Sequence, residues 1–168
     1  MTLAAQEVRE EVQHRQKKKL VLVVSKGTVD MLYPAFVLAT TAPATGMEVD
    51  LYFTFWGLKV LTKKGINSAK IGAVGNPGLP MPNILGMVPG MTAMATGMMK
   101  KRIEKYWPSV YDMIKMIKQS GGRIHACSPT MGFMGVDEKD LIPEVDDIVG
   151  ASTFLGWASQ PETVALFI

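Results

Sequence analysis

The chain has 168 residues, of which 48% are hydrophobic and 20% are charged, and its formal net charge is +3. This composition excludes a wholly disordered chain and suits one domain with its own core. The single cysteine excludes an intramolecular disulfide, so nothing in the sequence favours an oxidising compartment. The polar residues 1–19 contain no apolar signal-peptide core, and we therefore expect a cytoplasmic protein.

Positive charge is concentrated in two short clusters, at residues 17–19 and 100–102. Nucleic-acid-binding proteins usually carry a broader basic stripe interleaved with aromatic residues, so we expect no nucleic-acid partner. An anionic small substrate or an acidic protein partner suits this mild charge, and so do solvated lysines beside structural elements.

The first half of the chain alternates between strand and helix patterns. Residues 1–19 form a polar tail or an appended helix with only a thin apolar stripe. The β-branched run at residues 20–24 predicts a strand that is buried on both faces. The elements expected next are a helix over 29–41, a strand over 47–55, a short helix over 56–64 and a strand over 70–74.

The second half continues this alternation. A helix is predicted over 108–119, with Pro108 in its first turn and a Gly-Gly pair after its end. The remaining elements are a strand over 123–127, a helical turn over 137–141, an extended segment over 146–149, a helix over 151–159 and a strand over 163–168. Because strands alternate with helices, we expect a single α/β domain over residues 20–168. Its fold is predicted to be a three-layer sandwich with a mostly parallel sheet of about five strands.

Residues 76–99 form an uncharged insertion that is rich in methionine, proline and glycine. The proline and glycine content argues against a membrane-spanning helix. A helix that begins near Pro89 would present Met87, Met91, Met94 and Met98 together. Such a helix can pack into the core, form a subunit interface, or serve as a patch for a membrane surface or a hydrophobic partner. A fourth interpretation is a lid over the cysteine.

Cys127 is placed where the predicted strand 123–127 ends in a Ser-Pro turn. In open α/β sheets, ligands bind just beyond the carboxyl ends of the strands, so this thiol lies where chemistry is expected. The alternative is structural, since free cysteine often behaves as a small buried hydrophobic residue. A reactive thiol needs exposure and surroundings that favour the thiolate.

Three local features favour a thiolate at Cys127. Backbone N–H groups of the turn that begins at Ser128 and includes Thr130 can point at the sulfur. Lys26 follows the first strand and would share a sheet edge with Cys127 if the two strands are neighbours. His125 lies on the same strand face, roughly 6 to 7 Å along the strand. That separation also fits a packed, hydrogen-bonded histidine, and Lys26 also fits a solvated loop lysine.

No other catalytic motif is present in the sequence. The two histidines, His14 and His125, do not combine with the cysteine into a metal site of usual spacing, and no cofactor-binding fingerprint occurs. We therefore expect neither a metal nor a cofactor. A CxxC pair, which disulfide oxidoreductases carry, is also missing.

Several segments occur in a recognisable order: SKGTVD at 25–30, MEV at 47–49, FTFWG at 53–57, ACSPTMGFMG at 126–135 and ASTFL at 151–155. In this order they resemble the DsrE/DsrF-like family, in particular its peroxiredoxin-like DsrE subgroup of sulfur-trafficking proteins. The resemblance covers residues 20–168. It implies a small α/β protein that forms homo-oligomers, carries sulfur on Cys127 and works with TusA-like and rhodanese-like partners. Some relatives have a second functional cysteine, which this sequence does not contain.

Together these features predict a sulfurtransferase or sulfur carrier. The Cys127 thiolate would accept a persulfide or thiosulfonate sulfur from a partner protein and pass it on. Lys26, Ser128, Thr130 and His125 are the candidate anion-stabilising residues. The first alternative is a thiol peroxidase that forms a sulfenic acid, although Ile124, His125 and Ala126 replace the Thr or Ser of typical peroxiredoxins. The second is a non-enzymatic module that uses the methionine-rich segment to bind a partner or to associate with a membrane surface.

Overall fold

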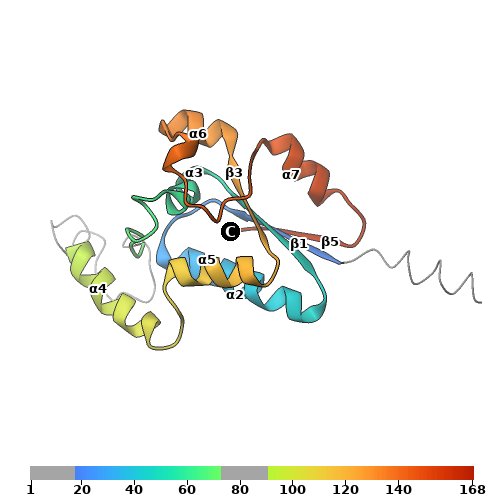
Figure 1. Ribbon diagram of the computed structural model, residues 1–168. Coiled ribbons are helices and arrows are strands. Elements are labelled where there is room, and N and C mark those ends of the chain that lie inside the picture. Colours follow the sequence, from blue (N-terminus) through green and yellow to red (C-terminus); the bar gives the residue numbers. More distant parts are fainter. Residues whose placement is uncertain (1–17, 73–90) are drawn as a thin grey trace, which may run out of the picture.

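A parallel β-sheet forms the centre of the computed structural model, which describes residues 18–72 and 91–168 (Figure 1). Its strands are β1 (Lys19–Val24), β2 (Glu48–Phe53), β3 (Arg123–Cys127), β4 (Asp147–Val149) and β5 (Thr163–Phe167). They lie in the order β4-β3-β2-β1-β5, and each neighbouring pair runs parallel. The predicted single α/β domain is therefore confirmed, with an all-parallel sheet of five strands.

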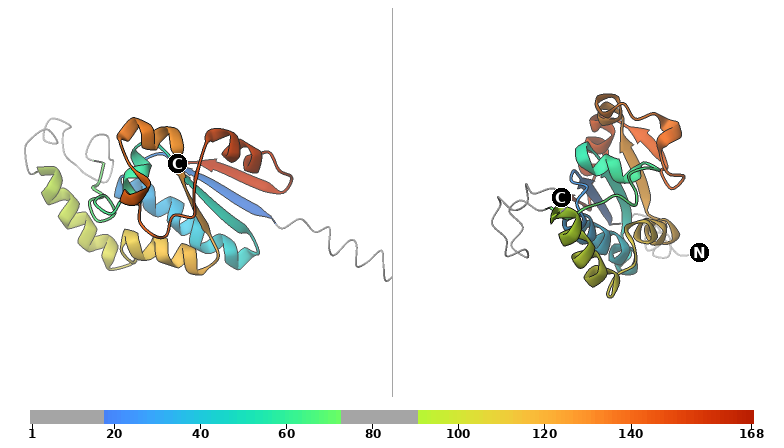
Figure 2. Two further views of the ribbon diagram at one scale, coloured as in Figure 1. Left: turned by 45° about the horizontal axis from the view of Figure 1, so that its top comes forward. Right: turned by 90° about the vertical axis from the view of Figure 1, so that its left-hand side faces the viewer.

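Helices flank this sheet on both faces (Figures 1 and 2). The described helices are α2 (Val29–Thr41), α3 (Phe55–Leu58), α4 (Met91–Glu104), α5 (Val110–Gln119), α6 (Ser128–Met134) and α7 (Ala151–Ala158). Of these, α4 projects away from the sheet (Figure 1). Short 3₁₀ helices are η1 (Ala42–Thr45), η2 (Lys59–Leu61) and η4 (Glu138–Asp140). In Figure 1, α2 and α5 lie below the sheet and α7 lies above it, while α3 and α6 lie near the carboxyl ends of β2 and β3.

The main core lies between the sheet and the α2–α5 layer. Every residue of β1 is buried, as the continuous apolar run predicted. Helix α5 places Met113, Ile114 and Ile117 on its buried face. The side chains that fill this layer include Leu20, Leu22, Leu51, Phe53, Ile124, Leu32 and Phe36. Because this layer is so completely packed, it holds the strand ends in a fixed arrangement.

The strand predicted over residues 70–74 is wrong for its described part, because residues 70–72 have no strand structure. Their backbone groups bond elsewhere: the Lys70 carbonyl accepts from Val29 N, Ile71 N donates to Thr96 Oγ1 and Gly72 N donates to Asp30 Oδ1. Ile71 is buried in the core, which accounts for the apolar pattern. The set of five strands is completed by β4, for which the sequence predicted only an extended segment.

Two helix starts differ from the prediction. Strand β2 ends before Thr54, and Phe55 then adopts a left-handed backbone conformation with a φ of 44°. Helix α3 therefore begins one residue earlier than expected. Helix α5 begins after Ser109, whose hydroxyl oxygen accepts a hydrogen bond from Asp112 N at 3.2 Å. Pro108 consequently lies before the capping residue and outside the first turn.

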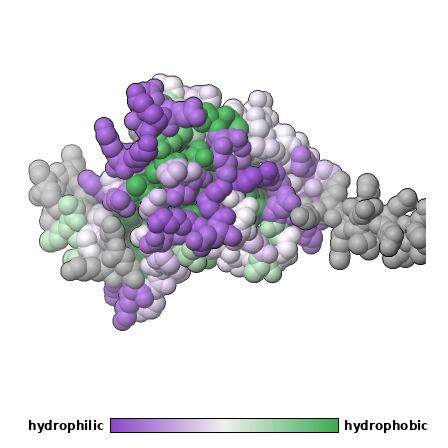
Figure 3. Space-filling model, in the orientation of Figure 1, coloured by the Kyte–Doolittle hydropathy of each residue, from purple (hydrophilic) through white to green (hydrophobic). Residues whose placement is uncertain are grey.

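The methionine-rich segment falls mostly outside the described residues, as does most of the predicted tail. Helix α4 covers the described end of that segment, and its Met94 and Met98 side chains are 57% and 68% exposed. Moderately hydrophobic surface is visible at this side of the molecule (Figure 3). This exposure argues against deep packing of these two residues. Within residues 18–72 and 91–168, no helix is both long enough and apolar enough to span a bilayer.

Candidate functional site

The thiol of Cys127 lies at the carboxyl edge of the sheet, between two elements. Cys127 is the last residue of β3 and also the N-cap residue of α6. The neighbouring strand β2 ends beside it, because the parallel register pairs Phe53 with Ala126. Side chains just beyond the end of β2 therefore meet the sulfur atom.

Hydroxyl groups surround this sulfur atom. Burial raises the pKa of the Cys127 thiol, but hydrogen bonds from the side chains of Thr130, Thr54 and Tyr52 and from the Thr130 backbone N–H lower it more. The pKa of the thiol therefore lies below that of an ordinary cysteine. These donors stabilise the thiolate, which is the nucleophilic form of cysteine.

Two of the hydroxyls also contact each other. Thr54 Oγ1 lies 3.0 Å from Thr130 Oγ1, and Phe55 N donates to Thr130 Oγ1 at 3.2 Å. The Thr130 hydroxyl accepts from the Phe55 N–H and retains its own proton, which it can donate to the sulfur. When Cys127 is a thiolate, both threonine protons can turn toward it. The arrangement therefore matches the charged sulfur better than the neutral thiol.

The backbone at Phe55 is strained next to the thiol. A φ of 44° is unfavourable for a residue with a β-carbon. Three hydrogen bonds support this turn: Phe55 N to Thr130 Oγ1, and Gly57 N to the carbonyls of Ser25 and Thr54. The strained turn holds Thr54 toward the thiol and leaves the Phe55 ring 58% exposed.

An apolar cluster covers the other side of the sulfur. Cys127 packs with Val23 and Tyr52, and the half-buried Val149 and Phe154 pack against them. The ring of Phe154, from α7, stacks on Tyr52 with centroids 5.4 Å apart and planes 23° apart. Burial and the contact with Cys127 raise the pKa of Tyr52, so its phenol stays protonated and donates. Only 5% of Cys127 is exposed.

Two of the predicted site residues are exposed and are not among the groups that hydrogen-bond the Cys127 sulfur. Lys26 lies in the loop after β1, and β2 lies between β1 and β3, so the strand adjacency that would bring Lys26 to the edge beside Cys127 is not present. Ser128 is exposed at the start of α6. Thr130 is placed as predicted near the sulfur, and both its side chain and its backbone N–H take part.

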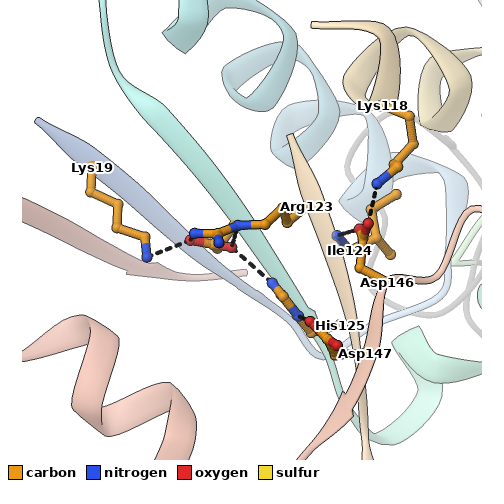
Figure 4. Close-up of polar contacts among 8 residues, drawn as sticks. Lys19, Lys118, Arg123, Ile124, His125, Asp146 and Asp147 are labelled. Carbon is orange, nitrogen blue, oxygen red and sulfur yellow. Dashed lines mark hydrogen bonds and ion pairs between the residues drawn. The ribbon is translucent and has the colours of Figure 1, made fainter. Parts of the chain in front are cut away.

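His125 lies on the same strand face as Cys127 but bonds to a different group. Its Nε2 is 2.8 Å from Asp50 Oδ1, and its ring packs against Trp157 with centroids 4.5 Å apart. Asp147 Oδ2 is 3.5 Å from His125 Nδ1, a nitrogen without a hydrogen-bond partner among the described residues. Figure 4 shows this ring beside the Asp147 carboxylate.

Asp50 is the centre of a buried polar cluster. Its side chain is fully buried and also accepts hydrogen bonds from Lys19 Nζ at 2.6 Å and from Arg123 Nε at 2.8 Å. Burial raises the pKa of this carboxyl, but the bonds from His125, Lys19 and Arg123 together lower it far below its usual range. Asp50 therefore stays ionised and holds the first residues of β1 and β3 against β2.

A second ion pair fixes the start of β3 (Figure 4). Asp146 accepts a hydrogen bond from Ile124 N at 2.7 Å and pairs with Lys118 at the end of α5. Among the residues that the structure describes, no cluster of histidine, cysteine and carboxylate side chains is arranged to hold a metal ion.

Sequence reasoning missed Tyr52, Thr54 and Asp50. Thr54 could have been predicted, because it lies at the end of a predicted strand. A polar residue at the end of a parallel strand is a candidate ligand position. Tyr52 and Asp50 fit an ordinary alternating strand, and no local signal distinguishes them.

The fold and this site define a class: a parallel α/β protein with an acidic, hydroxyl-bonded thiol at the carboxyl edge of its sheet. The model of the DsrE/DsrF/DrsH-like family matches residues 16–167. The chain belongs to that family, as the sequence resemblance indicated.

Two curated relatives match nearly the whole chain. The sulfur carrier protein DsrE2 of Allochromatium vinosum is 34% identical over 162 residues, which cover 91% of this chain and 99% of that protein. The uncharacterized protein YrkE of Bacillus subtilis is 30% identical, with 91% of this chain and 98% of that protein covered.

Solved structures resemble the chain in fold alone. MTH1491 from Methanobacterium thermoautotrophicum, a protein of unknown function, aligns with a TM-score of 0.57 at 12% identity, over 90% of this chain and 99% of that one. The ychN protein from E. coli aligns with a TM-score of 0.51 at 11% identity and the same coverage.

Proposed function

We propose that this protein is a sulfur carrier that holds a persulfide or a thiosulfonate on Cys127 and exchanges it with partner proteins. The observation that carries the proposal is the thiol itself, whose pKa is lowered by Thr130, Thr54 and Tyr52 at the carboxyl edge of the sheet. A sulfur-carrier name on a relative of 34% identity along nearly the whole chain supports it.

The transfer step needs only the thiolate and a sulfur donor. Cys127 Sγ attacks the terminal sulfur of a partner persulfide, an S–S bond forms to Cys127, and the S–S bond within the donor breaks. The partner leaves as a thiolate, and the terminal sulfur keeps its charge or proton. Since one S–S bond replaces another, no external oxidant or reductant is consumed. The reverse reaction unloads the sulfur onto an acceptor thiol.

The donors around Cys127 suit this chemistry in both directions. They stabilise the Cys127 thiolate before loading and again when it is the leaving group during unloading. With a single cysteine in the chain, transfer occurs directly between proteins. We propose TusA-like and rhodanese-like proteins as the exchange partners and the cytoplasm as the location.

We also propose that the protein forms homo-oligomers. Strand β5 is an edge strand without charged residues, and its Val164 and Phe167 side chains are 47% and 75% exposed. Exposed apolar residues on an edge strand favour association. Sedimentation velocity across a range of protein concentrations tests this, and a monomer at every concentration contradicts it.

The carrier function is tested by loading the reduced protein with tetrathionate or polysulfide and measuring its intact mass. The thiolate displaces thiosulfate from tetrathionate and keeps one thiosulfonate group; polysulfide leaves one or more sulfur atoms. We expect an adduct that dithiothreitol removes and that Cys127→Ser does not form. A wild-type mass that stays unchanged with both reagents contradicts the proposal.

A thiol peroxidase is the second candidate function. One observation favours it: Thr54 and Thr130 supply the hydroxyls near the thiol that the sequence before Cys127 does not contain. The same mass measurement separates the two functions when stoichiometric peroxide and an acceptor thiol protein are added in turn: a peroxidase gains oxygen on Cys127 with peroxide, whereas a carrier passes its sulfur adduct to the acceptor. The exposed Met94 and Met98 support the third candidate, a binding module, which requires no Cys127 chemistry.

We keep Lys26, Ser128 and His125 as proposed anion-stabilising residues for a loaded thiosulfonate, which extends beyond the thiol. Lys26→Ala is then expected to slow loading by tetrathionate, and high salt to slow the wild type toward the variant. Equal rates of loading by tetrathionate for the two proteins contradict a role of Lys26 at the site.

A further inference from the structure

The Cys127 thiol is activated but covered. Its hydroxyl donors favour the thiolate, which is the form that attacks a sulfur donor. Only 5% of the residue is exposed, although it lies at the edge of the sheet where a partner would approach. A displacement at sulfur requires the donor atom to reach Sγ directly. Some group must therefore move before a protein-bound sulfur can arrive.

The covering group comes from α7. Phe154 is the residue of α7 that packs against the cluster of Val23, Tyr52 and Cys127, and its ring stacks on Tyr52 with centroids 5.4 Å apart. The other covering residues, Val23, Tyr52 and Val149, belong to sheet strands that backbone hydrogen bonds fix in place. Phe154 is thus the covering side chain that can move without breaking the sheet.

Helix α7 is weakly attached to the rest of the fold. It has no buried residue, and its two half-buried aromatic residues, Phe154 and Trp157, make its described ring contacts with the sheet. Trp157 packs on His125 and lies 5.4 Å from Lys19 Nζ, toward the amino ends of the strands. The N-cap is Gly150, directly after β4, and a β-carbon there would meet only Ser152 Oγ at 3.8 Å.

These contacts divide the helix into two functional ends. Trp157 joins it to the buried polar cluster, which contains the fully buried Asp50. Phe154 packs against the cluster that contains Cys127, at the end of the helix that Gly150 caps. Elements with few buried apolar contacts open locally at low free energy. The thiol end of α7 is therefore the part of the site that can open while the sheet stays intact.

We propose that Phe154 is a gate residue that determines which sulfur donors reach Cys127. The inference rests on the sulfur-carrier function proposed above. With the ring in place, small sulfur compounds reach the thiolate slowly and a protein-bound donor does not reach it. A partner that contacts the exposed face of α7, where Leu155 is 63% exposed, displaces the ring and opens the thiol. Transfer is thereby coupled to partner binding.

The test is the rate of alkylation of Cys127 in the full chain, with iodoacetamide as the small reagent and a polyethylene-glycol maleimide as the bulky one. Rates are measured up to alkaline pH, where the thiolate fraction reaches its maximum and a changed pKa no longer alters the rate. For Phe154→Ala we expect the plateau rate with the bulky reagent to rise about tenfold, or about 1.4 kcal/mol, the scale of one aromatic contact. The small reagent should gain less.

Two further variants make the result specific. Phe154→Trp keeps an aromatic ring over Tyr52 and enlarges it, so its plateau rate with the bulky reagent should fall below that of the wild type. Thr153→Ala removes an exposed side chain from the same helix and should leave both rates unchanged. Equal plateau rates for wild type and Phe154→Ala overturn the gate. So does an equal rise in Thr153→Ala, because a general loosening of α7 then explains the effect.

Two measurements distinguish failure of the gate proposal from failure of the carrier proposal. Loading of the wild type by tetrathionate is measured beside the alkylation. Loading that occurs without any effect of Phe154 on alkylation overturns only the gate. A clear effect of Phe154 without any loading overturns the carrier function, and with it the role of the gate in sulfur transfer. Circular dichroism and thermal unfolding confirm that each variant is folded before rates are compared.

Discussion

The hydroxyl oxygens of Thr54 and Thr130 lie 3.0 Å apart although 76 positions separate them in the sequence. One follows β2 and the other lies in α6, and they meet because β2 and β3 are neighbours in the sheet. Both contact the Cys127 sulfur, together with Tyr52. This group of donors, rather than any charged side chain, sets the acidity of the thiol.

Removing one donor should raise the thiol pKa. Tyr52→Phe keeps the ring that stacks on Phe154 and removes only the hydroxyl. A hydrogen bond to a charged group is worth about 1.5–3 kcal/mol, so its loss should cost the thiolate a measurable part of its stability. Thiolate absorbance followed against pH should shift to higher pH. Thr54→Val and Thr130→Val should act in the same direction.

Tyr111→Phe is the matched control for the loss of a tyrosine hydroxyl. Its hydroxyl donates to Glu144 Oε1 at 2.8 Å, and Tyr111 is not among the groups that contact Cys127. The titration of the thiol should be the same as in the wild type. A Tyr52→Phe curve that superimposes on the wild-type curve would show that the phenol does not stabilise the thiolate.

Asp50→Asn should destabilise the fold strongly. The substitution leaves Lys19, Arg123 and His125 without their shared carboxylate, and breaking a buried ion pair costs about 3–5 kcal/mol. Urea denaturation gives the free energy of unfolding. Glu138→Gln, at an exposed carboxylate, should change it by less than about 0.5 kcal/mol.

The contribution of Asp50 also depends on pH. Because its pKa is lowered in the folded protein, the stabilisation is fully present above the unfolded pKa of about 3.9 and is lost as pH falls toward the folded pKa. The difference in unfolding free energy between wild type and Asp50→Asn should be constant above about pH 5 and should shrink below about pH 4. A difference that grows on acidification contradicts this role.

Gly57→Ala should be destabilising because α3 lies directly against β1. A β-carbon at Gly57 would be 2.2 Å from the Val24 carbonyl oxygen, a backbone atom. The strand end or the helix must shift, which costs about 1–3 kcal/mol or more. Gly156→Ala in α7, where a β-carbon meets nothing within 4 Å, should instead gain about 0.5–1 kcal/mol. Thermal unfolding compares the two, and equal effects contradict the close approach.

His125→Gln should lower stability and leave the thiol titration unchanged. The imidazole hydrogen-bonds Asp50 and packs on Trp157, and it is not among the groups that contact the Cys127 sulfur. The lost contacts cost about 1–3 kcal/mol. If the thiolate absorbance curve moves while the unfolding free energy stays constant, His125 acts on the sulfur as the sequence proposed.

Some of the fold and site followed from local patterns. The apolar run of β1 and the alternation of strands with helices indicated a covered parallel sheet, because burial on both faces requires apolar residues at successive positions. For β4 the sequence predicted only an extended segment, since Asp147–Val149 contains a charged residue and has little apolar pattern. A strand was predicted over residues 70–74, but residues 70–72 are not in a strand. A buried apolar side chain such as Ile71 gives the same sequence pattern in a strand and in a loop.

By itself, the sequence determined the class of fold, the position of Cys127 at a strand end and the approach of Thr130, which lies three residues further along the chain. Only the tertiary structure decided that Tyr52 and Thr54 contact the sulfur, that His125 bonds to Asp50, and that β2 separates Lys26 from the thiol strand. The physical reason is that residue periodicity reports which faces are buried. It does not report the order of the strands, and that order decides which distant side chains share a face.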